Sequence, residues 1–187
     1  CHVDVELGPV PQAAGSARVR LGHGTEVLVA IKGDIQEAAP SLTFTVETSS
    51  ASLAVSRETE DRVIQEGNEA MAACLSDIFV ASGAFDRRQL EIDGGRFGWA
   101  LFIDILVLQT AGNVLDAAVM AVRAALGQTR LPKVIVEGGG EAVGLSVSDA
   151  PEDLQQLSID TLPFCVTFGI FVDQSQSAGV PGLDDCQ

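Results

Sequence analysis

Alternating apolar and polar residues dominate the first quarter of the chain. Val3, Val5 and Leu7 alternate with acidic residues, a pattern typical of a half-buried strand. The stretch SARVRLGHGTEVLVAIKG holds two β-rich runs on either side of Gly22-His23-Gly24, which predicts a hairpin. The segment LTFTVET alternates in the same way and predicts a further strand. The chain is therefore expected to begin with a sheet.

The periodicity becomes helical over residues 57–79. Apolar residues recur there at three- and four-residue spacing, and carboxylates are enriched towards the start, where a helix dipole favours them. Gly83 is expected to end this segment. A second helix is predicted over residues 114–126, before Gly127 and Pro132.

Further strands are predicted around and after the second helix. Residues 89–92 and 97–108 are expected to pair around Gly94-Gly95, and the second of these strands is apolar on both faces, which predicts a central place in the sheet. KVIVE and FCVTFGIFV predict two more strands, with a glycine turn at 138–140 after the first. The expected architecture is α+β, with two strand pairs flanking two helices on one mixed sheet.

The composition is that of a packed domain. The chain has 187 residues, of which 47% are hydrophobic and 20% charged, and these proportions exclude a disordered chain. One domain over residues 1–187 is predicted, with a polar tail or loop at about 174–187. No apolar run approaches the roughly 20 residues that span a bilayer, so no membrane partner is expected.

The net charge of −15 argues against nucleic-acid binding over a broad surface. The net charge does not exclude RNA binding by a few arginines that line a channel. The four cysteines lack the spacing of zinc or redox motifs, and Cys74 and Cys165 are expected in the core of a reduced, intracellular protein. His2 and His23 have no ligand-type neighbours, so neither a metal site nor a cofactor is predicted.

The turn before the second helix is the first candidate for chemistry, because strand-to-helix turns of this kind can hold a phosphate. Asn113 is expected to cap the helix, with Asp116 three residues later completing a capping box. Asp116 would also repel a phosphate at the positive end of the helix, and residues 113–118 include no Ser, Thr, Lys or Arg. Structural capping is therefore favoured over anion binding.

Three arginines form the second candidate. Arg87, Arg88 and Arg96 make the only compact basic cluster, and it suits a solvated face and a contact with a backbone phosphate equally well. Asp104 interrupts an apolar strand and is expected to be satisfied at an interface or a helix N-terminus rather than to catalyse. The glycines at 138–140 lack the lysine-serine pair of a phosphate loop and predict a flexible turn.

Three stretches of the sequence resemble one protein family. They are GSARVRLGHGTEVLVAIKGDI at 15–35, WALFIDILVLQTAGNVLDAAVMAVRAALGQTRLPKV at 99–134 and LSIDTLPFCVTFGIF at 157–171. Together they resemble the RNase PH-like subunits of the RNA exosome ring. The resemblance implies an RNase PH-like fold (ribosomal protein S5 domain 2-like), a mixed sheet packed by helices. The family's aspartate-glycine-arginine start and its last strand and helices are not matched, so truncation at both ends is expected.

The family resemblance also implies a function. Such subunits pair into a hexameric ring, which together with cap subunits threads single-stranded RNA for 3′-to-5′ processing and degradation. Catalytic relatives carry an aspartate, two glycines and a hydroxyl residue across the turn, where this chain has Ala111, Gly112, Asn113 and Val114. The resemblance therefore predicts a degenerate phosphate site and a non-catalytic, structural subunit. The alternative is a subunit that lends arginines to a composite phosphorolytic site with its partner.

The same family places the RNA contact and the cellular location. The loop before the strand at 89–92 faces the pore in the family, which favours Arg87 and Arg88 over Arg96 as RNA-binding residues. A stand-alone RNA-binding module is disfavoured by the negative charge. The resemblance implies a protein of the nucleus and nucleolus that is also present in the cytoplasm.

Overall fold

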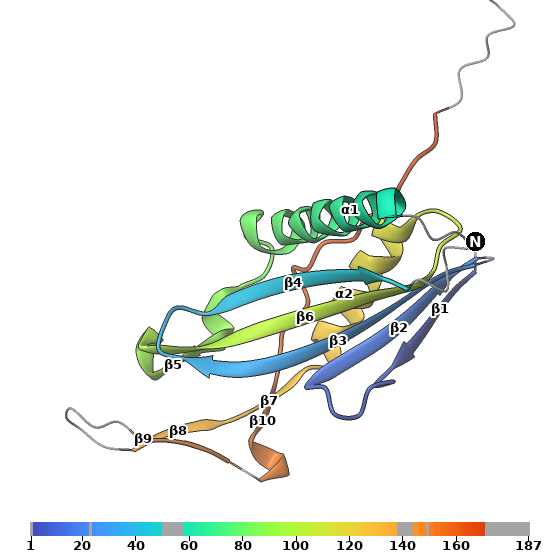
Figure 1. Ribbon diagram of the computed structural model, residues 1–187. Helices are drawn as coiled ribbons and strands as arrows, with labels where there is room; N and C mark the ends of the chain where they lie inside the picture. The colour runs from blue at the N-terminus through green and yellow to red at the C-terminus, as the bar shows by residue number, and fades with distance from the viewer. Residues whose placement is uncertain (1, 23, 50–57, 138–143, 149, 171–187) are drawn as a thin grey trace, which may run out of the picture.

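A computed structural model describes residues 2–22, 24–49, 58–137, 144–148 and 150–170, and its centre is a six-stranded mixed sheet (Figure 1). The strands are β1 (Val3–Leu7), β2 (Gly15–Leu21), β3 (Thr25–Gln36), β4 (Ser41–Thr48), β5 (Glu91–Ile92) and β6 (Phe97–Gln109). Their order is β1-β2-β3-β6-β4, with β5 paired to the start of β6. Only β4 and β6 run parallel among these neighbours, so the predicted mixed sheet is confirmed.

The clearest sequence patterns predicted the strands in the middle of this sheet. The predicted hairpin is β2–β3, with Leu21 opposite Thr25 at its closed end. Strand β6 is hydrogen-bonded to β3 on one side and to β4 on the other, so its predicted central position is also confirmed.

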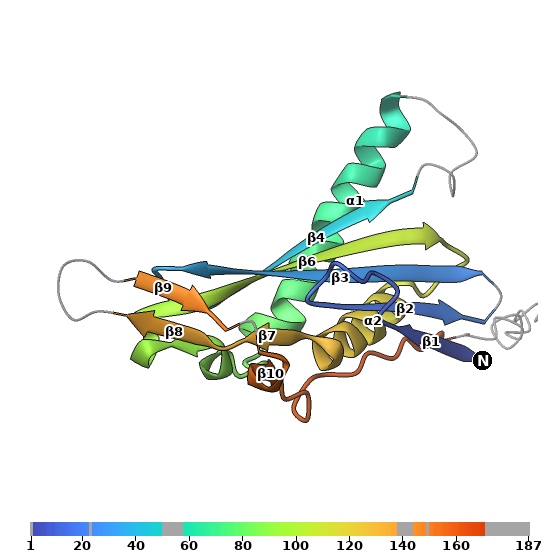
Figure 2. The same cartoon turned by 90° about the horizontal axis from the view of Figure 1, so that it is seen from below.

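Two helices cover one face of the sheet. Helix α1 (Glu58–Ser76) continues into a π-helical turn (Asp77–Ala81), and α2 (Val114–Gln128) follows β6. Helix α1 packs on β4, while α2 lies along β2 and β3 (Figures 1 and 2). Phe79 stacks on Phe44 of β4 with ring centroids 5.8 Å apart. Gly83 ends the helical region at a φ of +71°, a backbone conformation that glycine adopts without strain.

The helices and the sheet bury a continuous core between them. The inward positions of β3 and β6 are filled by Val27, Val29, Ile31, Leu101, Ile103, Ile105 and Val107. Small alanines on α2 allow it to approach the sheet closely. At Gly15 of β2 a Cβ atom would lie 2.6 Å from the carbonyl oxygen of Ala125 and 2.4 Å from Oγ1 of Thr129, so only glycine fits there.

The opposite face of the sheet is formed by the alternate residues of the same strands, and we call it the open face. Its central residues are Leu28, Ala30 and Lys32 of β3, Thr43, Thr45 and Glu47 of β4, and Phe102, Asp104 and Leu106 of β6. Asp104 is exposed on this face and does not meet a helix N-terminus there, so its expected contact at an interface stays a prediction. Successive residues of a strand point to opposite faces of the sheet, so Asp104 points away from the core that receives its neighbours Ile103 and Ile105.

The remaining described elements are short. They are the 3-10 turns Arg87–Leu90, Asp93–Gly95 and Pro151–Asp153, and the strands β7 (Arg130–Pro132), β8 (Val134–Glu137), β9 (Gly144–Val147) and β10 (Leu154–Gln156). β7 pairs with β10, and β8 pairs with β9. The predicted strand at 133–137 is thus confirmed, whereas β9 and β10 lie where no element was predicted. His23, the glycine turn at 138–140 and the tail from residue 174 lie outside the described residues.

Three other sequence predictions are wrong in detail. Half of residues 89–92, Gln89 and Leu90, belong to a 3-10 turn, and only Glu91–Ile92 pair with β6. Strand β1 forms as predicted, but Val3, Val5 and Leu7 are 43%, 45% and 53% exposed because β1 is an edge strand that α2 barely reaches. Cys74 and Cys165 are only partly buried.

The predicted strand FCVTFGIFV is the largest discrepancy. Its described residues, 164–170, are not assigned to a strand, and Phe168 and Ile170 are 82% and 89% exposed. The segment that follows β10 instead runs beside α2 (Figure 2). Its alternating pattern is that of a strand, but Thr167 is bonded to Asp116 of α2, which holds the segment beside that helix instead of at an edge of the sheet.

Candidate phosphate turn and nucleic-acid interface

The turn between β6 and α2 is held by a threonine from the hairpin. Thr25 is buried at the start of β3, and its Oγ1 accepts a hydrogen bond from the backbone N–H of Ala111 at 3.0 Å. The same hydroxyl donates to the carbonyl oxygen of Gly112 at 2.5 Å. Thr25 is thereby hydrogen-bonded to one backbone N–H and one carbonyl oxygen of the turn. The N–H of Ala111 is consequently not available to an anion.

The predicted capping box is not formed. Asn113 stands at the N-cap position, but its φ of +56° is left-handed and its side chain makes no capping hydrogen bond. A capping side chain reaches the first turn from an extended backbone, so the left-handed conformation removes this option. The carbonyl oxygen of Asn113 still accepts the first helical hydrogen bond, from the N–H of Ala117 at 3.2 Å.

Asp116 forms its hydrogen bonds with a distant segment of the chain instead of with Asn113. It is buried, and its two carboxylate oxygens accept hydrogen bonds from the backbone N–H and the Oγ1 of Thr167, both at 2.9 Å. Burial acts to raise the pKa of Asp116, but the hydrogen bonds from Thr167 and Cys165 outweigh it, so the pKa lies below its usual value. The carboxylate is therefore ionised at neutral pH, within the first turn of α2.

Cys165 belongs to the same cluster. Burial raises the pKa of the Cys165 thiol, and the neighbouring carboxylate of Asp116 raises it further. The thiol is thus neutral at physiological pH and serves Asp116 as a hydrogen-bond donor.

The structure separates the three arginines of the predicted basic cluster. Arg87 and Arg88 lie in the 3-10 turn before β5, whereas Arg96 stands between the 3-10 turn Asp93–Gly95 and the start of β6. Arg96 lies 3.7 Å from a carboxylate oxygen of Glu37, and its guanidinium carbon is 5.3 Å from the ring centre of Phe97. It is engaged locally and does not share a surface hollow with the other two.

Arg88 is held by an acidic neighbour. Its Nε and Nη2 donate to the two carboxylate oxygens of Asp86, each at 3.0 Å. Hydrogen bonds from the Arg88 side chain and backbone hold the pKa of Asp86 below its ordinary value. Arg87 forms no ion pair with any residue that the structure describes. Arg87 is consequently the cation of this turn that is available to a ligand.

A surface hollow of about 610 Å³ lies beside this arginine turn. Arg87, Arg88, Pro40, Phe85 and Thr161 are among its lining residues. The turn is tied down at two points: Oγ1 of Thr161 donates to the carbonyl of Ala84 at 2.8 Å, and the N–H of Ser158 donates to the Gln89 side chain at 2.8 Å. The hollow is also lined by the carboxylates of Asp86 and Glu91, so it combines charges of both signs with apolar walls on a backbone tied at two points.

Three residues that shape these sites were not singled out from the sequence: Thr25, Asp86 and Thr167. Asp86 directly precedes Arg87 and Arg88 in the sequence, so an ion pair between the carboxylate and an arginine was predictable. The partners of Thr25 and Thr167 lie 86 and 51 residues away, and no local pattern indicates them.

Two general findings bound the chemistry of this chain. Among the described residues, no His, Cys, Asp and Glu side chains gather in a group of three or more that could hold a metal ion. None of the helices in the described part is long and apolar enough to cross a membrane.

Comparison with known proteins decides the family. Residues 2–132 match RNase PH, the 3′ exoribonuclease family, domain 1. The chain belongs to the RNase PH family. The fold agrees, because a chain of the Archaeoglobus fulgidus exosome with RNA bound to the active site superposes with a TM-score of 0.60. That similarity covers 70% of this chain and 52% of the other, at 27% identity.

Other relatives in this family are described as exosome subunits. The exosome complex component Rrp42 of Thermococcus gammatolerans is 34% identical over 89% of this chain and 60% of its own length. Rrp42 of Methanothermobacter thermautotrophicus is 30% identical over the same shares, 89% and 60%. An archaeal exosome core shares the fold, with a TM-score of 0.58 and 24% identity over 77% of this chain and 62% of that one.

These comparisons confirm the resemblance to RNase PH-like exosome subunits, with relatives of the Rrp42 type, and the RNase PH-like fold class. This chain spans about three fifths of the length of its Rrp42 relatives.

Proposed function

We propose that this RNase PH-family chain is part of an Rrp42-type subunit of an exosome core ring, where it has a structural and RNA-threading role without a catalytic site of its own. The family match and the Rrp42 relatives support ring membership. In this role the subunit takes part in 3′-to-5′ RNA processing and degradation carried out by the assembly.

The buried, ionised carboxylate of Asp116 carries the non-catalytic part of the proposal. A phosphate at the N-terminus of α2 would meet this negative charge where the helix dipole would otherwise attract an anion. Asp116 cannot readily turn away, because Thr167 holds both of its oxygens. The turn itself offers Ala111, Gly112, Asn113 and Val114, none of which carries a cation or a hydroxyl.

The proposed partners are other RNase PH-like subunits in a hexameric ring, the cap subunits of the exosome, and single-stranded RNA. The exposed apolar residues of segment 164–170 support assembly, since surfaces of this kind are covered in functional complexes. No cofactor is proposed. The proposed location is the nucleus and nucleolus, with a further pool in the cytoplasm.

A second candidate is a subunit that lends arginines to a phosphorolytic site on its partner. The observation that favours it is Arg87, which lines the 610 Å³ hollow and has no ion-pair partner among the described residues. In this case Arg87 would bind phosphate groups although the chain has no complete site of its own.

Reconstitution with the RNase PH-like subunits of the same organism tests both candidates. Ring membership predicts co-elution as one complex at the mass of a hexamer, and a chain that stays separate from all of them contradicts it. In the assembled complex, Arg87→Ala distinguishes the two roles. Phosphate-dependent RNA shortening that persists at an unchanged maximal rate supports the structural role, whereas its loss in an intact ring supports the composite site.

A further inference from the structure

The open face of the central sheet has the composition of a protein interface. Direct cross-strand neighbours form rows across it: Leu28 of β3 and Leu106 of β6 lie side by side, with Glu47 of β4 next to Leu106. In another row, Phe102 lies between Lys32 and Thr43 and is 40% exposed. The two central strands thus contribute Leu28, Ala30, Phe102 and Leu106 to this face, with Lys32 and Asp104 among them, so apolar and charged residues alternate on it as they do in many protein interfaces.

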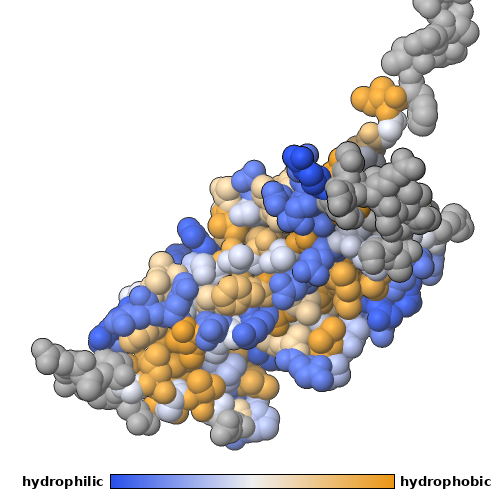
Figure 3. Space-filling model, viewed as in Figure 1, coloured by the Kyte–Doolittle hydropathy of each residue, from blue (hydrophilic) through white to orange (hydrophobic). Residues whose placement is uncertain are grey.

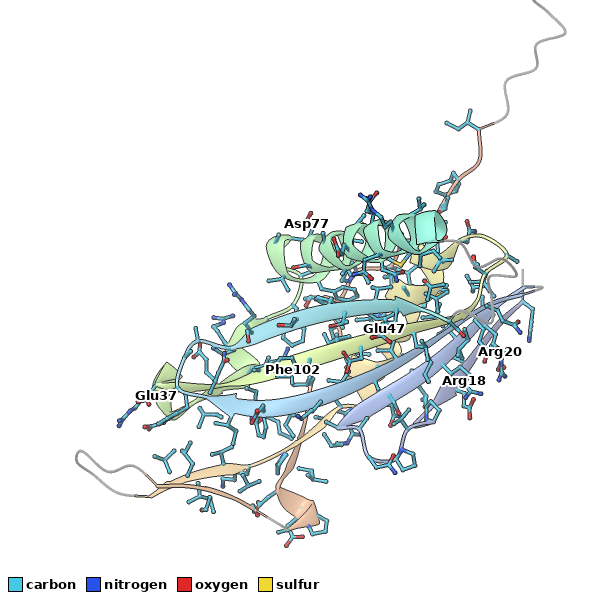
Figure 4. All side chains as sticks on the ribbon, viewed as in Figure 1. Arg18, Arg20, Glu37, Glu47, Asp77 and Phe102 are labelled. Carbon is cyan, nitrogen blue, oxygen red and sulfur yellow. The ribbon has the colours of Figure 1, made fainter. Side chains whose placement is uncertain are left out.

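Two figures show this face. Figure 3 looks onto this side of the sheet and shows apolar surface between hydrophilic residues. In Figure 4, Glu47 and Phe102 are labelled over β4 and β6 on this side, while Arg18 and Arg20 lie together at the far edge of the sheet.

Charges on the β1–β2–β3 side of the sheet are already paired. Arg18 lies 3.4 Å from Glu6, and Arg20 lies 3.2 Å from Asp4. Both guanidinium groups also approach Glu26, at 3.6 and 3.4 Å. These residues form a closed ladder of opposite charges, which leaves little net field for a ligand at this side.

The β4–β6 side is different. A hollow of about 370 Å³ opens there, and its lining includes the apolar residues Leu28, Ala30 and Leu106 together with Asp104, Glu47 and Thr45. Neither carboxylate forms an ion pair with a described residue, and Lys32, the cation of the neighbouring row, forms none either. Two unpaired negative charges therefore line the same depression as these apolar residues, in the middle of the sheet.

We propose that the open face docks a second protein, which inserts an arginine or lysine side chain into this hollow between Asp104 and Glu47. The aliphatic part of such a side chain matches the apolar lining residues, and its charged end matches the two carboxylates. Apolar residues of the partner cover Phe102. Nucleic acid does not fit this face, because its phosphates would meet both carboxylates. The proposal goes beyond ring membership and depends only on the open face.

Site-specific photo-crosslinking identifies what covers the face. A benzophenone amino acid replaces Phe102 in the full-length protein inside cells of its own organism, and a second variant carries it at Val63, which is exposed on α1. The expected result is one protein crosslinked from position 102 and absent from position 63, through a peptide that contains arginine or lysine. Crosslinking to RNA, to a second copy, to another part of the same chain or to nothing overturns the proposal.

Affinity measurements with the crosslinked partner then test the charge contact. Glu47→Gln combined with Asp104→Asn is expected to weaken binding by at least about tenfold and to flatten its salt dependence. The matched control, Asp77→Asn combined with Glu152→Gln, removes the same charge from exposed sites away from the face and is expected to leave affinity within about twofold. Equal weakening by both pairs, or by neither, contradicts the proposal.

Discussion

At the scale of single residues, Asp116 connects stability with the proposal that the turn before α2 does not bind phosphate. Its hydrogen bonds to Thr167 fasten the segment after β10 to the first turn of α2. The same bonds keep the carboxylate charged, because they lower its pKa in spite of burial. A single side chain therefore both anchors that segment and repels an anion from the helix N-terminus.

Asp116→Asn is expected to lower the free energy of unfolding at pH 7 by about 1–3 kcal/mol, since a buried charge-assisted contact is weakened. The folded-state pKa of Asp116 is depressed, so its stabilisation is present above the ordinary pKa near 3.8 and is lost as pH falls through the folded value. The difference between wild type and variant should therefore persist from pH 7 to about pH 4 and shrink below that.

Urea unfolding of the full-length protein at a series of pH values measures this difference. Asp77→Asn is the control, because Asp77 is an exposed carboxylate in the turn after α1 and its loss should cost less than about 0.5 kcal/mol. A gap that stays constant below pH 3, or an equal loss in the control, would show that Asp116 does not act through its charge.

Thr25 offers a second test at this scale. Thr25→Val keeps the shape but removes both hydrogen bonds to the turn, so unfolding free energy should fall by about 1–3 kcal/mol. Thr25→Ser retains the hydroxyl and should cost only about 1 kcal/mol for the lost methyl group. Thermal or urea unfolding of both variants measures whether the valine variant is the less stable of the two. A serine variant as unstable as the valine variant would contradict a stabilising role of the Thr25 hydroxyl.

The side chains of the turn were readable from the sequence, because they depend only on which residues stand side by side. Ala111, Gly112, Asn113 and Val114 carry no cationic or hydroxyl side chain, and the prediction of a degenerate phosphate site rests on this. The capping box was predicted wrongly, since Asn113 takes a left-handed backbone and Asp116 finds Thr167 instead. That partner lies on a distant segment, which local spacing cannot reveal.

At the scale of elements, close packing between α2 and β2 depends on one glycine. Gly15→Ala would place a methyl group against the backbone of α2 at Ala125, so it is expected to cost about 1–3 kcal/mol of unfolding free energy. Gly67→Ala should act in the opposite direction, because Gly67 is exposed within α1 with open space around it, and alanine favours a helix by about 0.5–1 kcal/mol.

Thermal unfolding of the two glycine variants provides the comparison. The expected melting temperatures lie on opposite sides of the wild-type value. A Gly15→Ala variant as stable as wild type would mean that α2 does not pack against β2 as closely as the structure shows.

Strands buried on one face were predictable, while segments that depend on distant partners were not. β2, β3, β4 and β6 follow their apolar alternation because the helices cover one side of the sheet. Segment 164–170 has an equally clear alternation, but Cys165 and Thr167 face Asp116 and the segment does not pair. A sequence shows which residues seek burial and leaves open which surface receives them.

At the scale of the whole molecule, an acidic chain must confine any RNA contact to a small region. The net charge is −15, and of the two turn arginines Arg88 is neutralised by Asp86. Arg87 is left as the cation that can contact a phosphate.

Arg87→Ala in the assembled ring is expected to reduce the log–log salt slope of single-stranded RNA binding by about 0.7, the value for one lost phosphate contact. Arg88→Ala should change the slope less, because Asp86 already offsets its charge. Arg62→Ala is the control, since Arg62 lies on α1 beside Glu66 and should leave the slope unaltered. Binding isotherms at several salt concentrations measure all three slopes, and equal slopes for every variant would exclude Arg87 as an RNA contact.

The most direct test of whether this chain is catalytic uses the full-length protein, purified without its ring partners. The protein is incubated with single-stranded RNA and inorganic phosphate. The ionised Asp116 and the substituted turn predict no phosphate-dependent shortening of the RNA above background. Measurable shortening that requires phosphate and disappears in an Asn113→Ala variant would contradict a non-catalytic subunit and place a working phosphate site at the start of α2.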